Sequence, residues 1–149
     1  MEIIERLEAA RDRTLSYFDI GDQRLDRTYG PGKWSVRYLL HHLADAEAVL
    51  YDRICRIISE PRQVIYAFDQ DAWAKSLDYS QAPLGLSRQI YESMRAGVIY
   101  KARLHYEKSG QLEWVHSQTG LRTLKQEFDK VASHNEGHLA QIESALKNS

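Results

Sequence analysis

Hydrophobic side chains recur every three or four residues in four separate stretches of the chain, which is the spacing of an amphipathic helix. The first stretch predicts a helix from Glu2 to about Asp19, and the second predicts one from Val36 to about Ser59. A third helix is expected from about Ser87 to Glu107, and a fourth from Thr123 to about Leu146. The second stretch keeps its period for about six turns and is the best defined of the four.

Local signals support the helix ends and one helix contact. Ser35 is a good N-cap for the second helix, because its hydroxyl can accept from a backbone N–H of the first turn. Thr123 and Gln126 match the Ser/Thr-x-x-Glu/Gln capping box at the start of the fourth helix. Gly97, in the middle of the third helix, is expected to permit close contact with a neighbouring helix.

The stretches between the helices contain turn-forming residues and no convincing strand. The segment from Pro61 to Gly85 has no clean period and is long for a plain connection. Within it, Asp71–Lys75 is expected to form a helical turn whose Trp73 anchors its indole in the bundle. The pattern predicts an all-α fold, an antiparallel four-helix bundle with a long connection between its second and third helices. We expect one domain over residues 1–149.

Composition and charge exclude several classes of partner. Twenty Lys and Arg against 21 Asp and Glu give a net charge of -1, without the basic cluster that nucleic-acid binding needs. No apolar run approaches the roughly 18 residues of a membrane span. The N-terminal residues lack the apolar stretch of a signal peptide, and the one cysteine, Cys55, has no internal disulfide partner. We expect a cytoplasmic protein in which Cys55 is a bystander thiol.

Two histidines in the fourth predicted helix are candidates for metal binding. His134 and His138 are four residues apart, so their side chains are separated by only about 40° around the helix. Gly137 lies between them, where it costs the helix about 1 kcal/mol relative to alanine, so we expect this position to need the space. The alternative is a pair of ordinary histidines, and a third ligand elsewhere would decide between the two.

The second predicted helix offers a third imidazole. With Leu43 at the centre of the apolar stripe, His42 lies about 100° away and borders the core, whereas His41 lies about 160° away. We therefore expect His41 to face solvent. In the fourth helix, Asn135 lies on the apolar face, where a buried amide must be hydrogen-bonded or face a polar cavity. Glu127 shares the flank of the two histidines.

Four blocks of the chain, in this order and taken together, resemble the DinB/YfiT-like superfamily. They are Trp34-Ser35, His42-Leu43-Ala44-Asp45-Ala46-Glu47, Phe68-Asp69-Gln70-Asp71-Ala72-Trp73-Ala74 and His134-x-x-x-His138-Leu139-Ala140-Gln141-Ile142. The stretch from Trp114 to Gly120 also resembles the loop before the last helix of these proteins. Tyr38 departs from the pattern, because many members carry a carboxylate three residues after the serine cap. This departure weakens the cap and leaves the metal site untouched.

The resemblance implies a single DinB-like domain that holds a divalent metal through His42, His134 and His138. Three imidazoles with open coordination positions suit Zn²⁺ or Ni²⁺, and ligand type alone does not choose between them. The resemblance also implies a small-molecule substrate and a homodimer.

Two classes of function follow from that metal site. One is a metal-dependent enzyme that activates a thiol or a water for attack on a small electrophile. S-transfer from a low-molecular-weight thiol is the first expectation and hydrolysis the second. Glu127, Asn135 and Gln141 are candidates for contacting the ligands or the substrate, with a solvated helix face as the alternative for Glu127 and Gln141. His116 is a candidate general base or substrate contact. The other class is a non-catalytic, stress-associated module that carries a metal or a small ligand.

Overall fold

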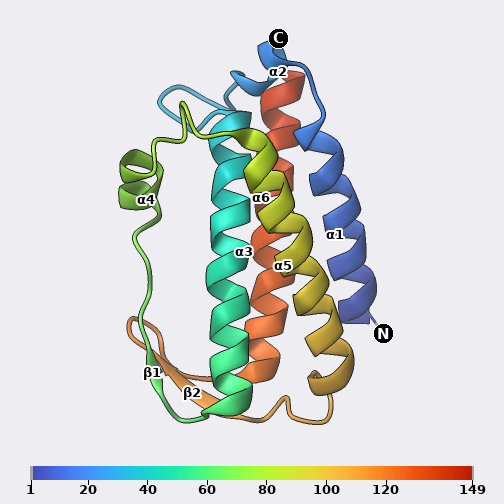
Figure 1. Cartoon of the computed structure of the whole chain (residues 1–149), viewed down its shortest axis with the longest axis vertical. Coiled ribbons are helices and arrows are strands. Elements are labelled where there is room, and N and C mark those ends of the chain that lie inside the picture. Colours follow the sequence, from blue (N-terminus) through green and yellow to red (C-terminus); the bar gives the residue numbers. More distant parts are fainter. Residues whose placement is uncertain (1, 149) are drawn as a thin grey trace.

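The computed structural model describes residues 2–148 and shows four long helices packed into a bundle (Figure 1). The bundle helices are α1 (Glu2–Phe18), α3 (Val36–Ser59), α5 (Leu84–His105) and α6 (Leu124–Lys147). All four were predicted from the hydrophobic period, and α3 has the predicted bounds. The predicted four-helix bundle is therefore confirmed. A single short turn, α2 (Asp22–Leu25), was not expected.

The predicted helix caps are present. The Ser35 hydroxyl accepts from the backbone N–H of Tyr38 at 3.3 Å, so the cap forms although Tyr38 replaces a carboxylate. Thr123 and Gln126 form the reciprocal capping box at the start of α6, with distances of 3.2 and 2.9 Å. Each cap satisfies backbone donors that the first turn of a helix leaves without partners.

The four helices run in two directions. Contacts from His41 to Ser87 and from Glu47 to Arg95 show that α3 and α5 are parallel neighbours. Contacts from His42 to His134 and from Arg53 to Glu127 show that α3 and α6 are antiparallel. Parallel neighbours need a long crossover.

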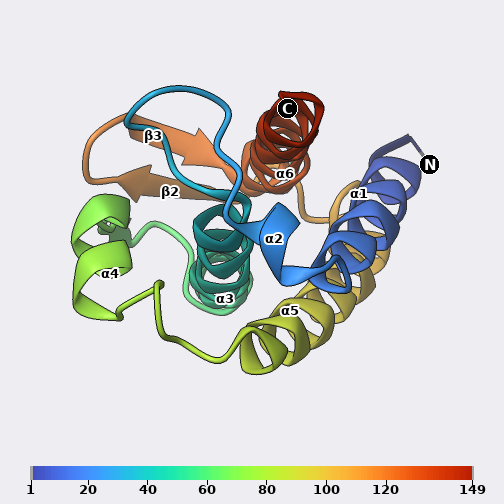
Figure 2. The same cartoon turned by 90° about the horizontal axis from the view of Figure 1, so that it is seen from above.

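Residues 60–83 form this crossover, and they follow the outside of α3 from one end of the bundle to the other (Figures 1 and 2). The crossover contains the strand β1 (Val64–Ile65) and the short helix α4 (Gln70–Ser76). Trp73 of α4 is only partly buried and packs against Phe68, with ring centroids 4.9 Å apart. The expectation that its indole enters the bundle was wrong.

A three-stranded sheet lies beside α3 and α6, although no strand was expected from the sequence. The hairpin of β2 (Glu113–His116) and β3 (Gly120–Thr123) is antiparallel, and β1 pairs with β2 in parallel. Val64 pairs with Val115, so residues distant in sequence hold this sheet together. Strands of two to four residues are too short for an alternating pattern to reveal them. Through this sheet, β1 of the crossover pairs with β2, the strand that carries His116.

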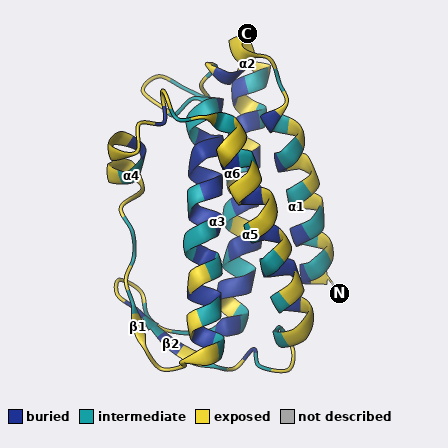
Figure 3. Cartoon of the chain, viewed as in Figure 1, coloured by how far each residue is buried: buried dark blue, intermediate teal, exposed yellow. Residues whose placement is uncertain are grey.

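The core divides into two apolar clusters with buried polar residues between them. One cluster includes Leu50, Val98 and Phe128, and the other includes Leu40, Tyr91 and Ile142. Figure 3 shows buried positions along the length of α3 and α6. Gly97 permits the expected close contact, since a Cβ there would meet the ring of Tyr51 at 2.6 Å. Within residues 2–148, no helix combines the length and apolarity that a membrane crossing requires.

Candidate metal centre

His42 lies on the inner face of α3, about two turns after the Ser35 cap, and is fully buried. Two aromatic rings hold its imidazole in place. The ring centroid of Trp34 is 5.1 Å from that of His42, and the Phe68 ring stacks at 6.3 Å. One ring precedes α3 and the other belongs to the crossover, so two connecting segments fix the orientation of one histidine.

His134 and His138 occupy successive turns of α6 and meet His42 across the antiparallel α3–α6 contact. Nε2 of His134 lies 3.1 Å from Nε2 of His42 and 3.1 Å from Nε2 of His138. Ligand nitrogens of all three residues lie within 4.8 Å of one another. The structure therefore brings together the three histidines that the sequence singled out.

Gln141 fixes the proton position on one of the three imidazoles. Its Oε1 lies 2.7 Å from Nδ1 of His138, and an amide oxygen can only accept a hydrogen bond, so Nδ1 donates. Neutral His138 then has a free lone pair on Nε2, directed at the other two rings. This arrangement, with an acceptor behind the imidazole, is typical of histidines that bind metals. Gln141 was a candidate for contacting the expected ligands or the substrate, and in the structure it contacts His138.

Burial keeps the histidine cluster uncharged. Desolvation lowers the pKa of His42 to about 3, with a smaller contribution from the nearby His138. Desolvation also lowers the pKa of His134 to about 3, and it lowers the pKa of His138. Imidazoles bind metal ions in their neutral form, so burial prepares all three rings as ligands at neutral pH.

The geometry and the donor chemistry fit a divalent metal. Zinc–nitrogen bonds of about 2.05 Å at tetrahedral angles place ligand nitrogens about 3.3 Å apart, close to the separations of 3.1 Å. The buried Nδ1 of His42 has no hydrogen-bond partner among the described residues, so the contacts of its ring nitrogens with the protein are confined to Nε2. No fourth His, Cys, Asp or Glu of residues 2–148 joins the cluster. Three imidazoles without a fourth protein ligand leave a coordination position open.

A pocket of about 320 Å³ opens beside the histidines, between α3, α6, the crossover and the hairpin. Its wall at one end includes His42 and His134. Apolar side chains from α3 and the crossover form one side, namely Ala46, Leu50, Ala67 and Phe68. A smaller pocket of about 250 Å³ adjoins His138 and Gln141 on the other side. The larger pocket is the size of a small-molecule site.

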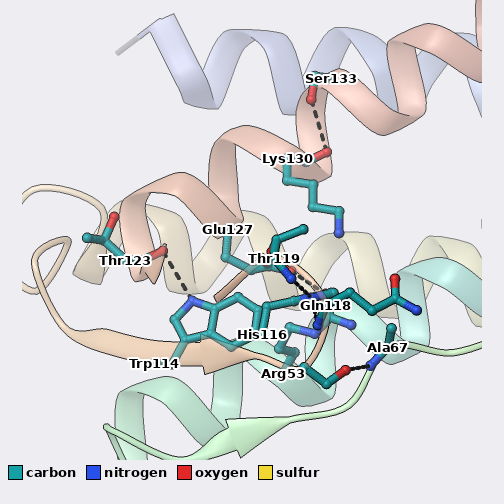
Figure 4. Close-up of polar contacts among 11 residues, drawn as sticks. Arg53, Ala67, Trp114, His116, Gln118, Thr119, Thr123, Glu127, Lys130 and Ser133 are labelled. Carbon is teal, nitrogen blue, oxygen red and sulfur yellow. Dashed lines mark hydrogen bonds and ion pairs between the residues drawn. The ribbon is translucent and has the colours of Figure 1, made fainter. Parts of the chain in front are cut away.

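His116, the candidate general base or substrate contact, lines the larger pocket. Its Nδ1 accepts from the backbone N–H groups of Gln118 and Thr119 at 3.1 and 3.2 Å (Figure 4). Burial, together with the nearby cations Arg53 and Lys130, lowers the pKa of His116, so the ring is neutral at pH 7. Its proton is then on Nε2, which makes His116 a hydrogen-bond donor in this state.

Glu127 and Asn135 have other partners than the histidines. Glu127 is fully buried and accepts from Arg53 at 2.8 Å, so it is not part of a solvated helix face. Asn135, predicted to be hydrogen-bonded or to face a polar cavity, is fully hydrogen-bonded. Its Oδ1 accepts from Tyr91 and Arg95, and its Nδ2 donates to Thr14. Neither residue contacts His42, His134 or His138 through a hydrogen bond.

Two expectations about neighbours of the cluster were wrong. His41 does not face solvent, because it is only 1% exposed. Its Nδ1 lies 2.7 Å from the Ser87 hydroxyl of α5, and its ring stacks on Tyr79 at 5.2 Å. The side of α3 opposite its apolar stripe is thus covered by α5 and the crossover. Gly137 does not need its space, since no atom lies within 4 Å of where a Cβ would be.

Two cationic residues of the pocket, Arg53 and Lys130, were not among the site residues predicted from the sequence. The helical period contains a signal for both. Lys130 precedes His134 by four residues, and Arg53 follows His42 by eleven, so each shares the face of a pocket histidine. Polar residues on the face of a candidate ligand are a useful guide to the rest of a site.

Comparisons with known proteins agree with this fold. The DinB superfamily model matches residues 6–144. A protein of Oceanobacillus iheyensis named "Putative metal-dependent hydrolase" is 30% identical over 129 residues, which cover 87% of this chain and 74% of that protein. A Bacillus cereus protein of the same name is 29% identical over 138 residues, covering 90% and 77%.

Among solved structures, YfiT from Bacillus subtilis has the same fold. It is described as "a probable metal-dependent hydrolase with an unusual four-helix bundle topology". It superposes with a TM-score of 0.87 and 24% identity over 97% of this chain and 83% of that chain. Because the family match covers most of the sequence, the chain belongs to the DinB superfamily.

Proposed function

We propose that this protein is a metal-dependent hydrolase whose metal is held by His42, His134 and His138. The observation that carries the proposal is the convergence of three imidazoles beside a pocket, with Nε2 of His134 3.1 Å from Nε2 of each of the other two and no fourth protein ligand among residues 2–148. Relatives that are about 30% identical carry the name "Putative metal-dependent hydrolase". Zn²⁺ and Ni²⁺ are the metals that suit three neutral imidazoles.

A divalent metal held by these histidines would act as a Lewis acid and would lower the pKa of a bound water towards 7. The side chains of the protein then have separate tasks. Gln141 orients His138, and the rings of Trp34 and Phe68 orient His42. His116 donates a hydrogen bond from Nε2 to an oxygen of the substrate, and we propose this contact as its part in catalysis. Its Nδ1 is occupied by two backbone donors, so a role as general base through that nitrogen is excluded in this arrangement.

Thiol S-transfer is the second candidate, because the same open position accepts a thiolate in place of water. A metal ion deprotonates a coordinated thiol. The larger pocket, about 320 Å³, has room for a small thiol or for a small electrophile. A non-catalytic module is the third reading of the same three histidines, and it predicts metal binding without turnover.

One experiment separates these functions. Zinc-loaded and nickel-loaded protein would be incubated with a panel of p-nitrophenyl esters and anilides. In parallel, it would be incubated with chlorodinitrobenzene and glutathione, bacillithiol or mycothiol. Hydrolysis is expected to depend on metal and to be absent in the His134→Ala variant. Turnover only in the thiol reactions would replace hydrolase by S-transferase, and metal binding without turnover in either series would favour the module.

We also propose a homodimer in the cytoplasm. Four large apolar side chains, Leu86, Ile90, Tyr100 and Leu104, are exposed on α5. Their spacing places them within about 40° of one line along that helix, which suits burial against a second copy. Light scattering coupled to size-exclusion chromatography would measure the mass. A monomer at high protein concentration would contradict the dimer.

A further inference from the structure

The pocket beside the histidines is lined by cations and by no carboxylate. Its twelve lining residues include Arg53 and Lys130, whereas Asp and Glu are absent from the lining. A nearby carboxylate, Glu127, is fully buried and directs Oε1 to Arg53 at 2.8 Å. A pocket with this lining has a positive potential, which favours an anionic ligand.

Lys130 is the cation without a partner. Its side chain is partly buried, and no carboxylate of residues 2–148 lies within 4 Å of its ammonium, whereas Lys125 on the same helix pairs with Glu107. Burial lowers the pKa of Lys130, and so do Arg53 and Arg122, against the opposing effect of Glu127. Figure 4 shows the side chain directed from α6 toward the turn of Gln118 and Thr119. A bound anion would compensate this ammonium.

Arg53 is held rigidly at the same end of the pocket. Its guanidinium donates to Glu127 and lies over the ring of Trp114, 5.4 Å from the centroid. Only one ion pair is formed, and the buried Nε has no partner among the described residues. The pair of Arg53 and Glu127 therefore has no net charge, and Lys130 supplies the uncompensated positive charge of the pocket.

Neutral donors complete the same end of the pocket. The Nε2 proton of His116 is available because its Nδ1 accepts from two backbone groups. The side chains of Gln118 and Thr119 also line the pocket. Ammonium, imidazole and hydroxyl donors together suit the several oxygen atoms of a carboxylate or a phosphate.

We propose that the substrate carries an oxyanion, a carboxylate or a phosphate, which Lys130 binds at the end of the pocket beyond the histidines. This inference rests on the proposed function, because it assumes that the bond to be hydrolysed lies at His42 and His134. Lys130 is one helical turn from His134, about 6 Å along the axis. The oxyanion and the reacting bond are then a few bonds apart in a small molecule.

Binding of simple anions to the zinc-loaded protein tests the inference. The probes are succinate, inorganic phosphate and the neutral analogue succinamide, followed by chemical shifts of the Gln118 and Thr119 amides. Lys130→Gln is expected to weaken binding of the preferred anion at least about tenfold, because a charged hydrogen bond is lost. The matched control is Lys147→Gln, which changes the net charge equally at an exposed position of α6. Comparison of succinate with phosphate identifies the class of oxyanion.

Kinetics with matched esters provides the second readout. For a p-nitrophenyl ester that carries a carboxylate, Lys130→Gln is expected to raise KM about tenfold, while the matched neutral ester is unaffected. Equal binding of succinate and succinamide, or equal loss in both lysine variants, would overturn the anion site. Zinc binding and hydrolysis of neutral esters would persist in that case. Failure of the unmodified protein to bind zinc, or to hydrolyse any of the esters, would instead overturn the proposed function.

Discussion

Two buried polar clusters lie side by side in this bundle, and they differ in how their hydrogen-bonding groups are satisfied. One is the polar layer, which we define as Thr14, Glu47, Tyr91, Arg95 and Asn135, drawn from all four bundle helices. The other is the cluster of His42, His134 and His138. Asn135 follows His134 directly in the sequence, so α6 contributes neighbouring residues to the two clusters.

The polar layer is satisfied by its own members and by one backbone carbonyl of α1. Arg95 donates to both carboxylate oxygens of Glu47 at 2.6 and 3.0 Å, to the Leu7 carbonyl at 3.0 Å and to Asn135 at 2.6 Å. Burial raises the pKa of Tyr91, which donates to Asn135 at 2.6 Å. Buried polar groups with complete partners specify how elements pack. This layer has a structural role.

The histidine cluster is not satisfied by the protein. Three neutral rings direct nitrogens at one another at 3.1 Å, and neutral imidazoles cannot all pair in that way. Leaving buried acceptors without partners costs free energy, unless a ligand from outside the chain completes them. The two clusters are both polar, but only the polar layer has hydrogen-bond partners within the protein for its interacting groups, and that difference is what we propose distinguishes a structural cluster from a metal site.

Glu47→Gln would break the polar layer and has the largest expected effect. Arg95 would lose its counter-charge in the core, so the free energy of unfolding should fall by about 3–5 kcal/mol. Urea denaturation measures the change, and zinc bound per folded chain should be unaltered. The double variant Glu47→Leu/Arg95→Met removes both charges and should lose much less. Equal losses in the single and double variants would contradict a structural ion pair.

His134→Ala would break the histidine cluster instead. Loss of a proposed ligand should weaken zinc binding by more than about a hundredfold, because even residues behind the ligands contribute about ten- to a hundredfold. Elemental analysis after dialysis measures bound zinc, and urea denaturation of the metal-free variant should show little change in stability. His41→Ala is the matched control on α3 and should retain zinc. Zinc loss in His41→Ala with retention in His134→Ala would reverse the assignment.

The positions that the sequence predicted well are those that depend on one helix alone. The bounds of α3, both caps and the shared flank of His134 and His138 follow from the helical period and from local hydrogen bonding. The inward position of His42 follows in the same way. The family resemblance then related two helices far apart in sequence, and the structure places their histidines together.

The features that were missed depend on contacts between distant segments. His41 is buried by Ser87 and Tyr79, neither of which affects the period of α3. Val64 forms a strand only because Val115 is beside it. For Asn135, the sequence left open a hydrogen-bonded amide or a polar cavity, and the partner that decides between them, Arg95, belongs to α5. The helical period predicts which side of a helix is buried. Tertiary contacts determine which groups are the hydrogen-bond partners of its buried polar side chains.

Gln141→Leu would sharpen the comparison with a smaller effect. Without the amide oxygen, Nδ1 of His138 loses the acceptor that keeps the Nε2 lone pair directed at the cluster, so zinc affinity should fall about ten- to a hundredfold. Competition with a chelator of known affinity measures this change. Gln141→Glu keeps an acceptor at the same place and should restore binding. A loss of equal size in Gln141→Glu would show that the role is not hydrogen bonding.

Gly137→Ala has the smallest expected effect. It tests separately the stability of α6 and the geometry of the histidine cluster. A Cβ at this position meets no atom within 4 Å, and alanine is favoured over glycine in a helix interior by about 1 kcal/mol. The free energy of unfolding should therefore rise by about 0.5–1 kcal/mol in urea denaturation, with zinc affinity unchanged.

Gly97→Ala is the matched control for that gain, because the same substitution in α5 would bring a Cβ to 2.6 Å from the Tyr51 ring. The propensity gain is equal at the two sites, so any difference between the variants reports packing. Gly97→Ala is expected to be neutral or destabilising, since the half-buried Tyr51 ring must move away from its position beside Lys101. A rise in the free energy of unfolding for Gly97→Ala would show that the side chains at the α3–α5 contact rearrange at little cost. A destabilising Gly137→Ala would mean that the turn between the two histidines needs its glycine after all, for the geometry of the cluster.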